Sequence, residues 1–225
     1  AYDRTAFGFT DRPLSWVGIN PYSFEGQLQV LDDVIEKFAA NKNVTLVGHS
    51  AGGALALEYT IQNPGRIDNL ILIAPALSGN GPYPAWLQPV FSIPQINHLG
   101  PILVSRIATE GLSILEQSYF DPKLITEATV NGYTAPLKVQ NWEQAFWEFV
   151  KAPRYQTSSI QSLKSRTLIL TGDSDVIVPT SSSIKNAGLS SFTQLVILKN
   201  TGHLPHEEKP TKFVSAVNEF LKGTN

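Results

Sequence analysis

The stretch that decides the fold is "VTLVGHSAGG", residues 44–53. It starts with β-forming residues and ends in small residues on both sides of one serine, Ser50. A Gly-x-Ser-x-Gly sequence between a strand and a helix bends the backbone sharply and presents the serine as a nucleophile. The alternative is an ordinary glycine-rich turn that happens to contain a serine. The flanking segments decide between the two.

Both flanks have the expected signals. Residues 44–47 predict a short strand, and residues 51–63 predict a mostly apolar helix that Pro64 and Gly65 stop. Ser50 therefore lies at a strand-to-helix turn, which favours the nucleophile over the ordinary turn.

The small residues around Ser50 fit the same interpretation. Side chains two positions from such a serine crowd it, and Gly48 and Gly52 meet that requirement. The turn also places Ser50 at a helix N-terminus, where the Ala51 N–H can stabilise a developing negative charge. We interpret Gly48, His49 and Gly52 as parts of a nucleophile elbow, with Ala51 as one oxyanion-hole donor.

The rest of the chain alternates strand and helix signals, as α/β proteins with a mostly parallel sheet do. Its apolar runs are of the continuous kind that is covered on both faces of a parallel sheet. The first helix has an apolar stripe at helical spacing. The predicted strands are 44–47, 70–74, 167–171 and 194–198; the predicted helices are 23–40 (stripe Leu28, Leu31, Ile35 and Phe38), 51–63, 180–187 and 210–222.

Residues 76–158 interrupt this alternation with several prolines and helix-like stretches at 103–119 and 141–151. We predict an inserted helical cap over 76–158, and a core of residues 1–75 and 159–225. The aromatic residues of the cap either fill its own core or line a substrate cavity. The candidate pocket residues are Trp86, Phe91, Trp142, Phe146 and Trp147 from the cap and Val176 from the core.

A neutral serine hydroxyl needs a base to become a nucleophile, and the base needs an orienting acid. The chain has four histidines. His203 follows the last predicted strand, at the carboxyl edge of the sheet where Ser50 also lies. We expect the His49 side chain to leave the turn on the side opposite to Ser50, His98 to lie in the insertion, and His206 to pack or bond locally. His203 is therefore the predicted base.

The acid is sought between residue 159 and His203, where the only candidates are Asp173 and Asp175 in "LILTGDSDVIVP". Asp175 directly precedes an apolar run and should be buried, whereas Asp173 should face water or cap the Gly-Asp-Ser turn. The segment after strand 70–74 offers no carboxylate before Glu110. The predicted triad is Ser50, Asp175 and His203.

Composition limits the partners. A formal net charge of −2 gives no electrostatic footprint for nucleic acid. The absence of cysteine excludes disulfides, a thiolate nucleophile and a cysteine-based zinc site. The longest apolar runs are too short to span a bilayer. We expect a small-molecule substrate and neither a metal nor an organic cofactor. The oligomeric state and the compartment stay open, with a cytoplasmic location as the working expectation.

Four motifs in the correct order resemble the α/β-hydrolase superfamily, in its capped esterase-like and lipase-like group. The order nucleophile, acid, histidine matches the elbow, "LILTGDSD" and "GHLPHEEKP". "AYDRTAFGFTDRP" resembles the family's Asp-x-x-Gly-x-Gly-x-Ser loop, with Ala6 and Thr10 as departures. The resemblance implies an α/β-hydrolase fold with a cap between the sixth strand and the next helix.

The same resemblance implies first strands, and a His-Gly loop with the second oxyanion N–H, before the "AYD" segment. We therefore expect these N-terminal strands to be missing from this sequence and the natural protein to be longer.

For activity, the resemblance implies hydrolysis of a carboxylic ester or similar acyl bond of a small, largely apolar substrate. Carbon–carbon bond hydrolysis of meta-cleavage-type diketone acids is an alternative, because related capped enzymes perform it with the same triad. That chemistry needs an anchor for a carboxylate, and cations in or near the cap are candidates. A ligand receptor on the same scaffold is a further alternative from a different functional class.

Overall fold

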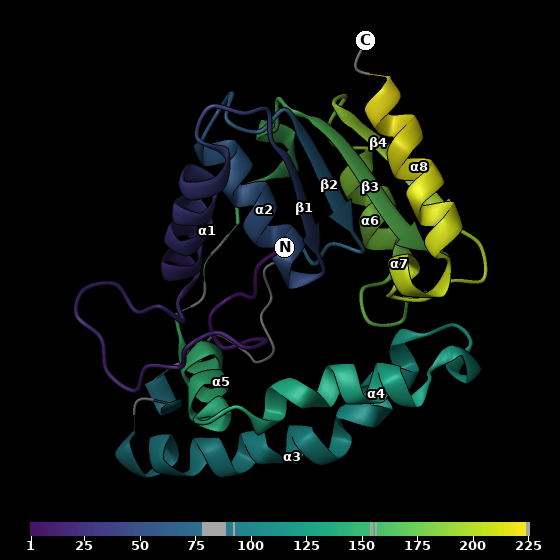
Figure 1. Cartoon of the computed structure of the whole chain (residues 1–225). Helices are drawn as coiled ribbons and strands as arrows, with labels where there is room; N and C mark the ends of the chain where they lie inside the picture. Colours follow the sequence, from purple (N-terminus) through teal and green to yellow (C-terminus); the bar gives the residue numbers. More distant parts are fainter. Residues whose placement is uncertain (78–88, 92, 154, 156, 224–225) are drawn as a thin grey trace. The chain divides into compact units, whose positions relative to one another are not determined.

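The structure is a computed structural model that describes all residues except 78–88, 92, 154, 156 and 224–225, and except the side chains of 107–109. The chain divides into two compact units (Figure 1). The sheet unit comprises Ala39–Ser78, Leu115–Leu124 and Gln156–Asn225, and the helical unit comprises Ala1–Phe38, Gly79–Ile114 and Ile125–Tyr155. The division by contacts thus assigns 1–38 and 115–124 differently from the boundaries expected for core and cap.

The sheet unit contains four parallel strands in the order β1-β2-β3-β4. Each predicted strand is present, and no strand end is shifted by more than two residues. Because parallel strands end at one edge, the segments that follow them gather there. The strands are β1 (Thr45–His49), β2 (Asn69–Ile73), β3 (Arg166–Gly172) and β4 (Thr193–Leu198).

The central and edge strands differ in burial. All five residues of β2 are buried, as are six of the seven in β3, so both are covered on two faces as predicted. The same expectation is wrong for β4, in which only Leu198 is buried. β4 has one neighbouring strand in the described sheet, and its apolar run is therefore only half covered.

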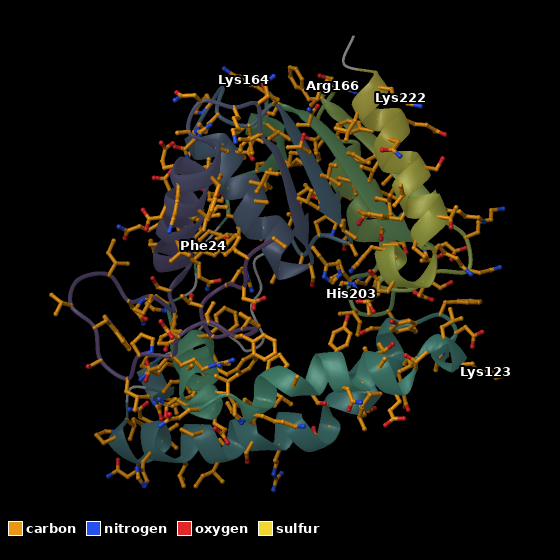
Figure 2. The ribbon with its side chains drawn as sticks, in the orientation of Figure 1. Phe24, Lys123, Lys164, Arg166, His203 and Lys222 are labelled. Atoms are coloured by element: carbon orange, nitrogen blue, oxygen red, sulfur yellow. The ribbon has the colours of Figure 1, made fainter. Side chains whose placement is uncertain are left out.

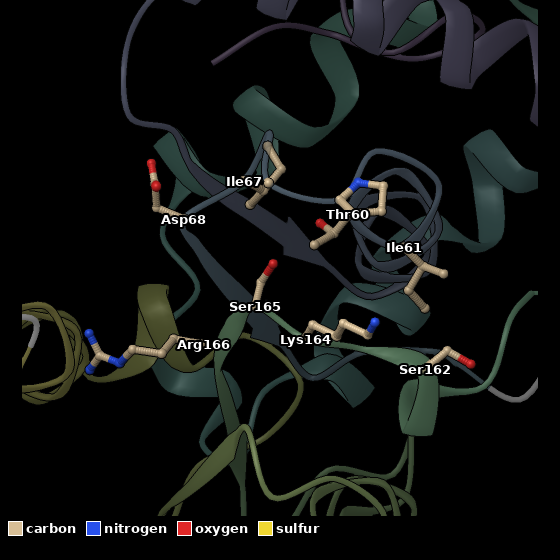
Figure 3. Close-up of a pocket in the computed structure, with 10 residues that line it drawn as sticks. Thr60, Ile61, Ile67, Asp68, Ser162, Lys164, Ser165 and Arg166 are labelled. Carbon is tan, nitrogen blue, oxygen red and sulfur yellow. The ribbon is translucent and has the colours of Figure 1, made fainter.

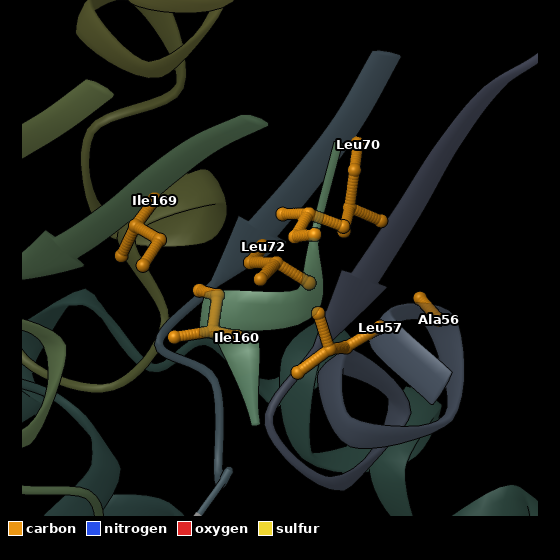
Figure 4. Packing of buried hydrophobic residues seen from close by; sticks show 7 residues of the cluster. Ala56, Leu57, Leu70, Leu72, Ile160 and Ile169 are labelled. Carbon is orange, nitrogen blue, oxygen red and sulfur yellow. The ribbon is translucent and has the colours of Figure 1, made fainter. Parts of the chain in front are cut away.

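Alternate residues of the central strands enter two separate cores, as the two-residue period of a strand requires. Leu70 and Leu72 face helix α2 (Ala51–Gln62), helix α6 (Thr180–Ala187) and the turn Ile160–Ser162 (Figure 4). Ile71 and Ile73 face helix α8 (Pro210–Lys222). Burying one such side chain stabilises the fold by about 1.5–3 kcal/mol.

The helices of the sheet unit agree closely with the expected ones. Among the described α-helices of this unit, only α7, a single turn that begins two residues after His203, was not predicted, since four residues are too few for a periodic pattern. The helices are α2 (Ala51–Gln62), α6 (Thr180–Ala187), α7 (Pro205–Glu208) and α8 (Pro210–Lys222).

The helical unit contains no strand among its described residues, in line with the interruption predicted from the sequence. Leu28, Leu31 and Ile35 of α1 are buried, but Phe38 is 65% exposed, so the predicted stripe ends one turn early. The helices are α1 (Phe24–Ala39), α3 (Pro94–Ser118, whose last turn belongs to the sheet unit), α4 (Glu127–Thr134) and α5 (Trp142–Lys151).

An aromatic core holds α3 and α5 together within the helical unit. Trp147 is 4% exposed, and its indole N–H donates to Asn97 Oδ1 over 2.8 Å. A Cβ on Gly100 would lie only 2.0 Å from the Trp147 ring, so glycine is required for this close approach. No described helix is both long and apolar enough to cross a membrane.

Candidate active site

The elbow holds Ser50 in a backbone conformation that L-residues rarely adopt, with φ 51° and ψ −122°. Such strain persists only where surrounding contacts maintain it. The Ser50 N–H donates to the Ile73 carbonyl over 2.9 Å, and the Ser50 carbonyl accepts from Gly53 and Ala76. These bonds join the end of β1 to the end of β2. Ala51 opens α2, and its N–H belongs to the first turn, which has no intrahelical acceptor.

Crowding at the elbow differs from the expectation at one of its two glycines. A Cβ on Gly48 would lie 2.5 Å from the Gly52 carbonyl oxygen, so Gly48 is sterically required. Outside its chain neighbours and its own helix backbone, a Cβ on Gly52 would meet no described heavy atom within 4 Å, and the expected crowding at Gly52 is wrong. The second required glycine is Gly53, whose Cβ would lie 2.9 Å from Pro75. Helix α2 passes close to the segment after β2 there.

Asp175 and His203 form a buried pair. Asp175 Oδ2 lies 2.8 Å from His203 Nδ1, and the two side chains are 0% and 6% exposed. The other carboxylate oxygen accepts the N–H groups of Ile177 and Val178 over 2.9 Å each, which fixes the carboxylate. Because a carboxylate accepts, Nδ1 carries the proton, and Nε2 of the neutral ring is left as a base.

The loop that carries His203 leaves β4 and crosses the end of β3. A Cβ on Gly172 would lie 2.0 Å from the Thr201 carbonyl oxygen and 2.3 Å from that of Gly202. Gly172 therefore allows the crossing that brings His203 to Asp175. Sequence reasoning did not single out Gly172, although a glycine at the end of an apolar strand is a signal for close backbone approach.

His49 contacts the loop of His203 and does not point away from it as expected. Its Nε2 lies 3.0 Å from the His203 carbonyl oxygen, so Nε2–H is the donor. The centroids of the two imidazole rings are 4.7 Å apart. Burial, together with repulsion from a charged His203, lowers the pKa of His49 to about 4. His49 is therefore neutral at physiological pH.

The remaining candidates lie where the sequence suggested. His206 packs on His49 and Phe213, with ring centroids 5.1 and 5.9 Å apart, and burial lowers its pKa. His98 is exposed on α3. Asp173 is exposed and accepts from Ser174 and from the Thr201 N–H, as a turn carboxylate does.

The structure therefore brings Asp175 and His203 together but forms no hydrogen bond between the Ser50 hydroxyl and His203. Contacts of this kind often tighten only when substrate binds. Both side chains belong to the sheet unit, and the carboxyl edge carries all three predicted residues.

The candidate pocket residues separate into two groups. Val176 is 67% exposed beside the buried Asp175. The aromatic candidates Phe91, Trp142, Phe146 and Trp147 form one cluster of the helical unit, where they fill its core, which is the packing alternative left open above. Trp86 lies outside the described residues.

A cavity of about 520 Å³ lies at the other edge of the sheet, where β2 and β3 begin (Figure 3). Asp68, Lys164 and Arg166 line it, together with residues from the end of α2. Figure 2 shows Lys164 and Arg166 at the opposite end of the sheet unit from His203. This cavity is therefore separate from the Asp175–His203 pair. Among the described residues, no group of three or more His, Asp or Glu could hold a metal ion.

Comparison with known proteins identifies relatives that are similar to this chain over most of its length. The 2-hydroxy-6-oxo-2,4-heptadienoate hydrolase of Pseudomonas putida is 26% identical over 98% of this chain and 77% of its own length. A putative esterase/lipase of Mycoplasma pneumoniae is 26% identical over 85% of this chain and 68% of its own length.

Solved structures share the fold. A meta-cleavage product hydrolase from Pseudomonas fluorescens superposes with a TM-score of 0.72 at 23% identity, over 99% of this chain and 79% of its own. An esterase from Exiguobacterium antarcticum superposes with a TM-score of 0.69 at 17% identity, over 98% of this chain and 80% of its own. The family model described as "alpha/beta hydrolase fold" matches residues 1–210. The chain therefore belongs to the α/β-hydrolase family.

Proposed function

We propose that the chain is a serine hydrolase that cleaves a carboxylic ester or similar acyl bond through an acyl-enzyme on Ser50. The observation that carries the proposal is the buried Asp175–His203 pair at the edge where the strained Ser50 follows β1. Buried acid–imidazole pairs beside a serine are the arrangement that activates a hydroxyl for attack on a carbonyl.

In the proposed reaction, His203 Nε2 takes the Ser50 proton as the hydroxyl oxygen attacks the carbonyl carbon. The Ala51 N–H then stabilises the oxyanion of the tetrahedral intermediate. Asp175 holds the imidazole in the Nδ1–H tautomer and stabilises its protonated form. His203 returns the proton to the leaving alcohol, and a water molecule activated by the same imidazole hydrolyses the acyl-enzyme.

Apolar side chains beside the pair support a largely apolar substrate. Val176 and Ile177 follow Asp175 directly and are 67% and 39% exposed, although both are large and apolar. Exposed apolar residues next to a reactive group commonly contact ligand. We propose that Val176 contacts the acyl or alcohol part of the substrate.

A fluorophosphonate probe tests the proposed nucleophile. We expect one probe molecule per protein, with peptide mass mapping to Ser50 and no labelling of a Ser50→Ala variant. Ser113, on the helical insertion, provides the matched control, since Ser113→Ala should label as the parent does. A folded protein that stays unlabelled at Ser50 would contradict the proposal.

Carbon–carbon hydrolysis of a diketone-type acid is a second candidate, because several relatives carry names of that class. Its substrate carboxylate needs a cation. Lys151, one of the cap cations, already contacts Glu148 over 2.7 Å and Asn97 over 2.9 Å. Lys138 and Arg106 are exposed within the helical unit and are further candidates for an anchor.

A substrate panel separates the two activities. Turnover of short p-nitrophenyl esters that exceeds turnover of a 2-hydroxy-6-oxo-dienoate by 100-fold or more in kcat/KM would support the esterase. The reverse preference would assign carbon–carbon hydrolysis, and it should then depend on Lys138 or Arg106.

A further inference from the structure

The carboxylate of Glu208 is buried next to the loop of His203 and binds two backbone amides. One of its oxygens accepts the Gly202 N–H over 2.6 Å, and the other accepts the Phe120 N–H over 2.8 Å. Glu208 itself is 7% exposed. One side chain therefore joins Gly202, the residue before His203, to Phe120, which lies 88 positions before Glu208 in the chain.

The segment that it joins is Ser118–Phe120, where α3 ends. The His203 N–H donates to the Ser118 carbonyl over 2.7 Å. A Cβ on Gly202 would lie 2.5 Å from that same carbonyl oxygen and 2.9 Å from the Phe120 nitrogen, so the two backbones are in direct contact. The Tyr119 hydroxyl donates to Glu207 over 2.6 Å, which adds a side-chain bond between the same two segments.

We propose that Glu208 is a positioning residue for His203. Its two oxygens hold Gly202 against Phe120, and the Ser118 carbonyl accepts the His203 N–H, so the segment at the end of α3 fixes the backbone of His203. The position of His203 relative to Asp175 and Ser50 then depends on the end of α3. This inference rests on the proposed function for the role of His203, but the contacts around Glu208 stand independently of it.

The geometry requires two acceptor oxygens, one for each backbone N–H; a carboxylate has two and an amide has one. In Glu208→Gln the shape is kept, but the amide nitrogen would face one of the two backbone N–H groups, and one buried donor would lose its partner. A misplacement of a catalytic group by 1 Å can lower turnover by about 100-fold. Glu208→Asp keeps both oxygens on a shorter side chain.

The experiment measures fluorophosphonate labelling rates at Ser50 and ester turnover across pH for the full chain and three variants. We expect Glu208→Gln to lower the labelling rate and kcat by about 10- to 100-fold with a small change in KM. Glu208→Asp should recover part of the loss. Glu207→Gln, the matched control, removes a neighbouring charge but keeps an acceptor for Tyr119, and should stay within about 2-fold of the parent.

A spectroscopic readout separates positioning from a loss of folded protein. The low-field proton resonance of the His203 Nδ1–H to Asp175 bond should shift or broaden in folded Glu208→Gln and stay unchanged in Glu207→Gln. An unchanged resonance, or an unchanged labelling rate per folded molecule, would overturn the proposal. A parent protein that is not labelled at Ser50 would instead overturn the proposed function, and the resonance would still decide the role of Glu208.

Discussion

The elbow of Ser50 and the loop of His203 are built in different ways. The elbow combines a local pattern with backbone bonds: Gly48 must avoid the Gly52 backbone, α2 begins directly after Ser50, and the Ser50 backbone bonds the segment at the end of β2. The loop of His203 is held by side chains from distant segments, Asp175 at 28 positions and His49 at 154 positions.

This difference explains which half of the site is easier to recognise and which is easier to disrupt. A local turn leaves its pattern in a few consecutive letters, whereas a loop held by distant partners leaves single residues whose purpose is visible only in space. Substitutions at distant partners should therefore displace His203 while leaving the elbow intact.

The largest expected effect is on turnover, from the partner of His203. Asp175→Asn keeps the shape but favours the wrong imidazole tautomer, and should lower kcat by about 10⁴-fold. Asp173→Asn changes an exposed carboxylate at the same edge and should change kcat by less than about 3-fold. Steady-state ester hydrolysis by the two variants measures both, and similar losses would contradict the assignment of the acid.

The second effect is on stability as a function of pH. His49 has a pKa near 6.5 when unfolded and about 4 when folded, so between these values the unfolded chain binds the proton more readily. The free energy of unfolding should fall by about 2–3 kcal/mol as the pH drops from 6.5 to 4. The stabilising contribution of neutral His49 is fully present above pH 6.5.

Urea unfolding at a series of pH values measures this contribution. His49→Gln keeps an N–H for the His203 carbonyl but does not titrate, so its stability should fall less than that of the parent across this window. Parallel curves for the two proteins would show that His49 is not buried as a neutral ring.

The smallest effects distinguish the two glycines of the elbow. Gly48→Ala places a Cβ 2.5 Å from a backbone oxygen and should lower the free energy of unfolding by about 1–3 kcal/mol. Gly52→Ala meets open space in helix α2 and should be neutral or stabilising by up to about 1 kcal/mol. Chemical denaturation of both variants measures the difference; equal losses would restore the expectation that both glycines are crowded.

Strands, most helices and the candidate residues were predictable because their signals are local. Continuous apolar runs predicted β2 and β3, and the apolar run after Asp175 favoured it over Asp173, which is exposed. Periodicity could not find α7, which has four residues, nor the exposure of Phe38 at the end of its stripe. The half-covered β4 was missed because composition does not reveal which strand has a single neighbour.

The sequence by itself determined the order of strands and helices, the elbow of Ser50 and the candidate partners Asp175 and His203. Only the tertiary structure decided that Gly172 lets one loop cross another strand, that Gly53 and not Gly52 is crowded, and that Glu208 joins Gly202 to Phe120. The physical reason is the separation along the chain over which each kind of interaction acts. Backbone propensity and side-chain period act over a few residues, whereas close approach and buried hydrogen bonds connect segments that the chain brings together only by folding.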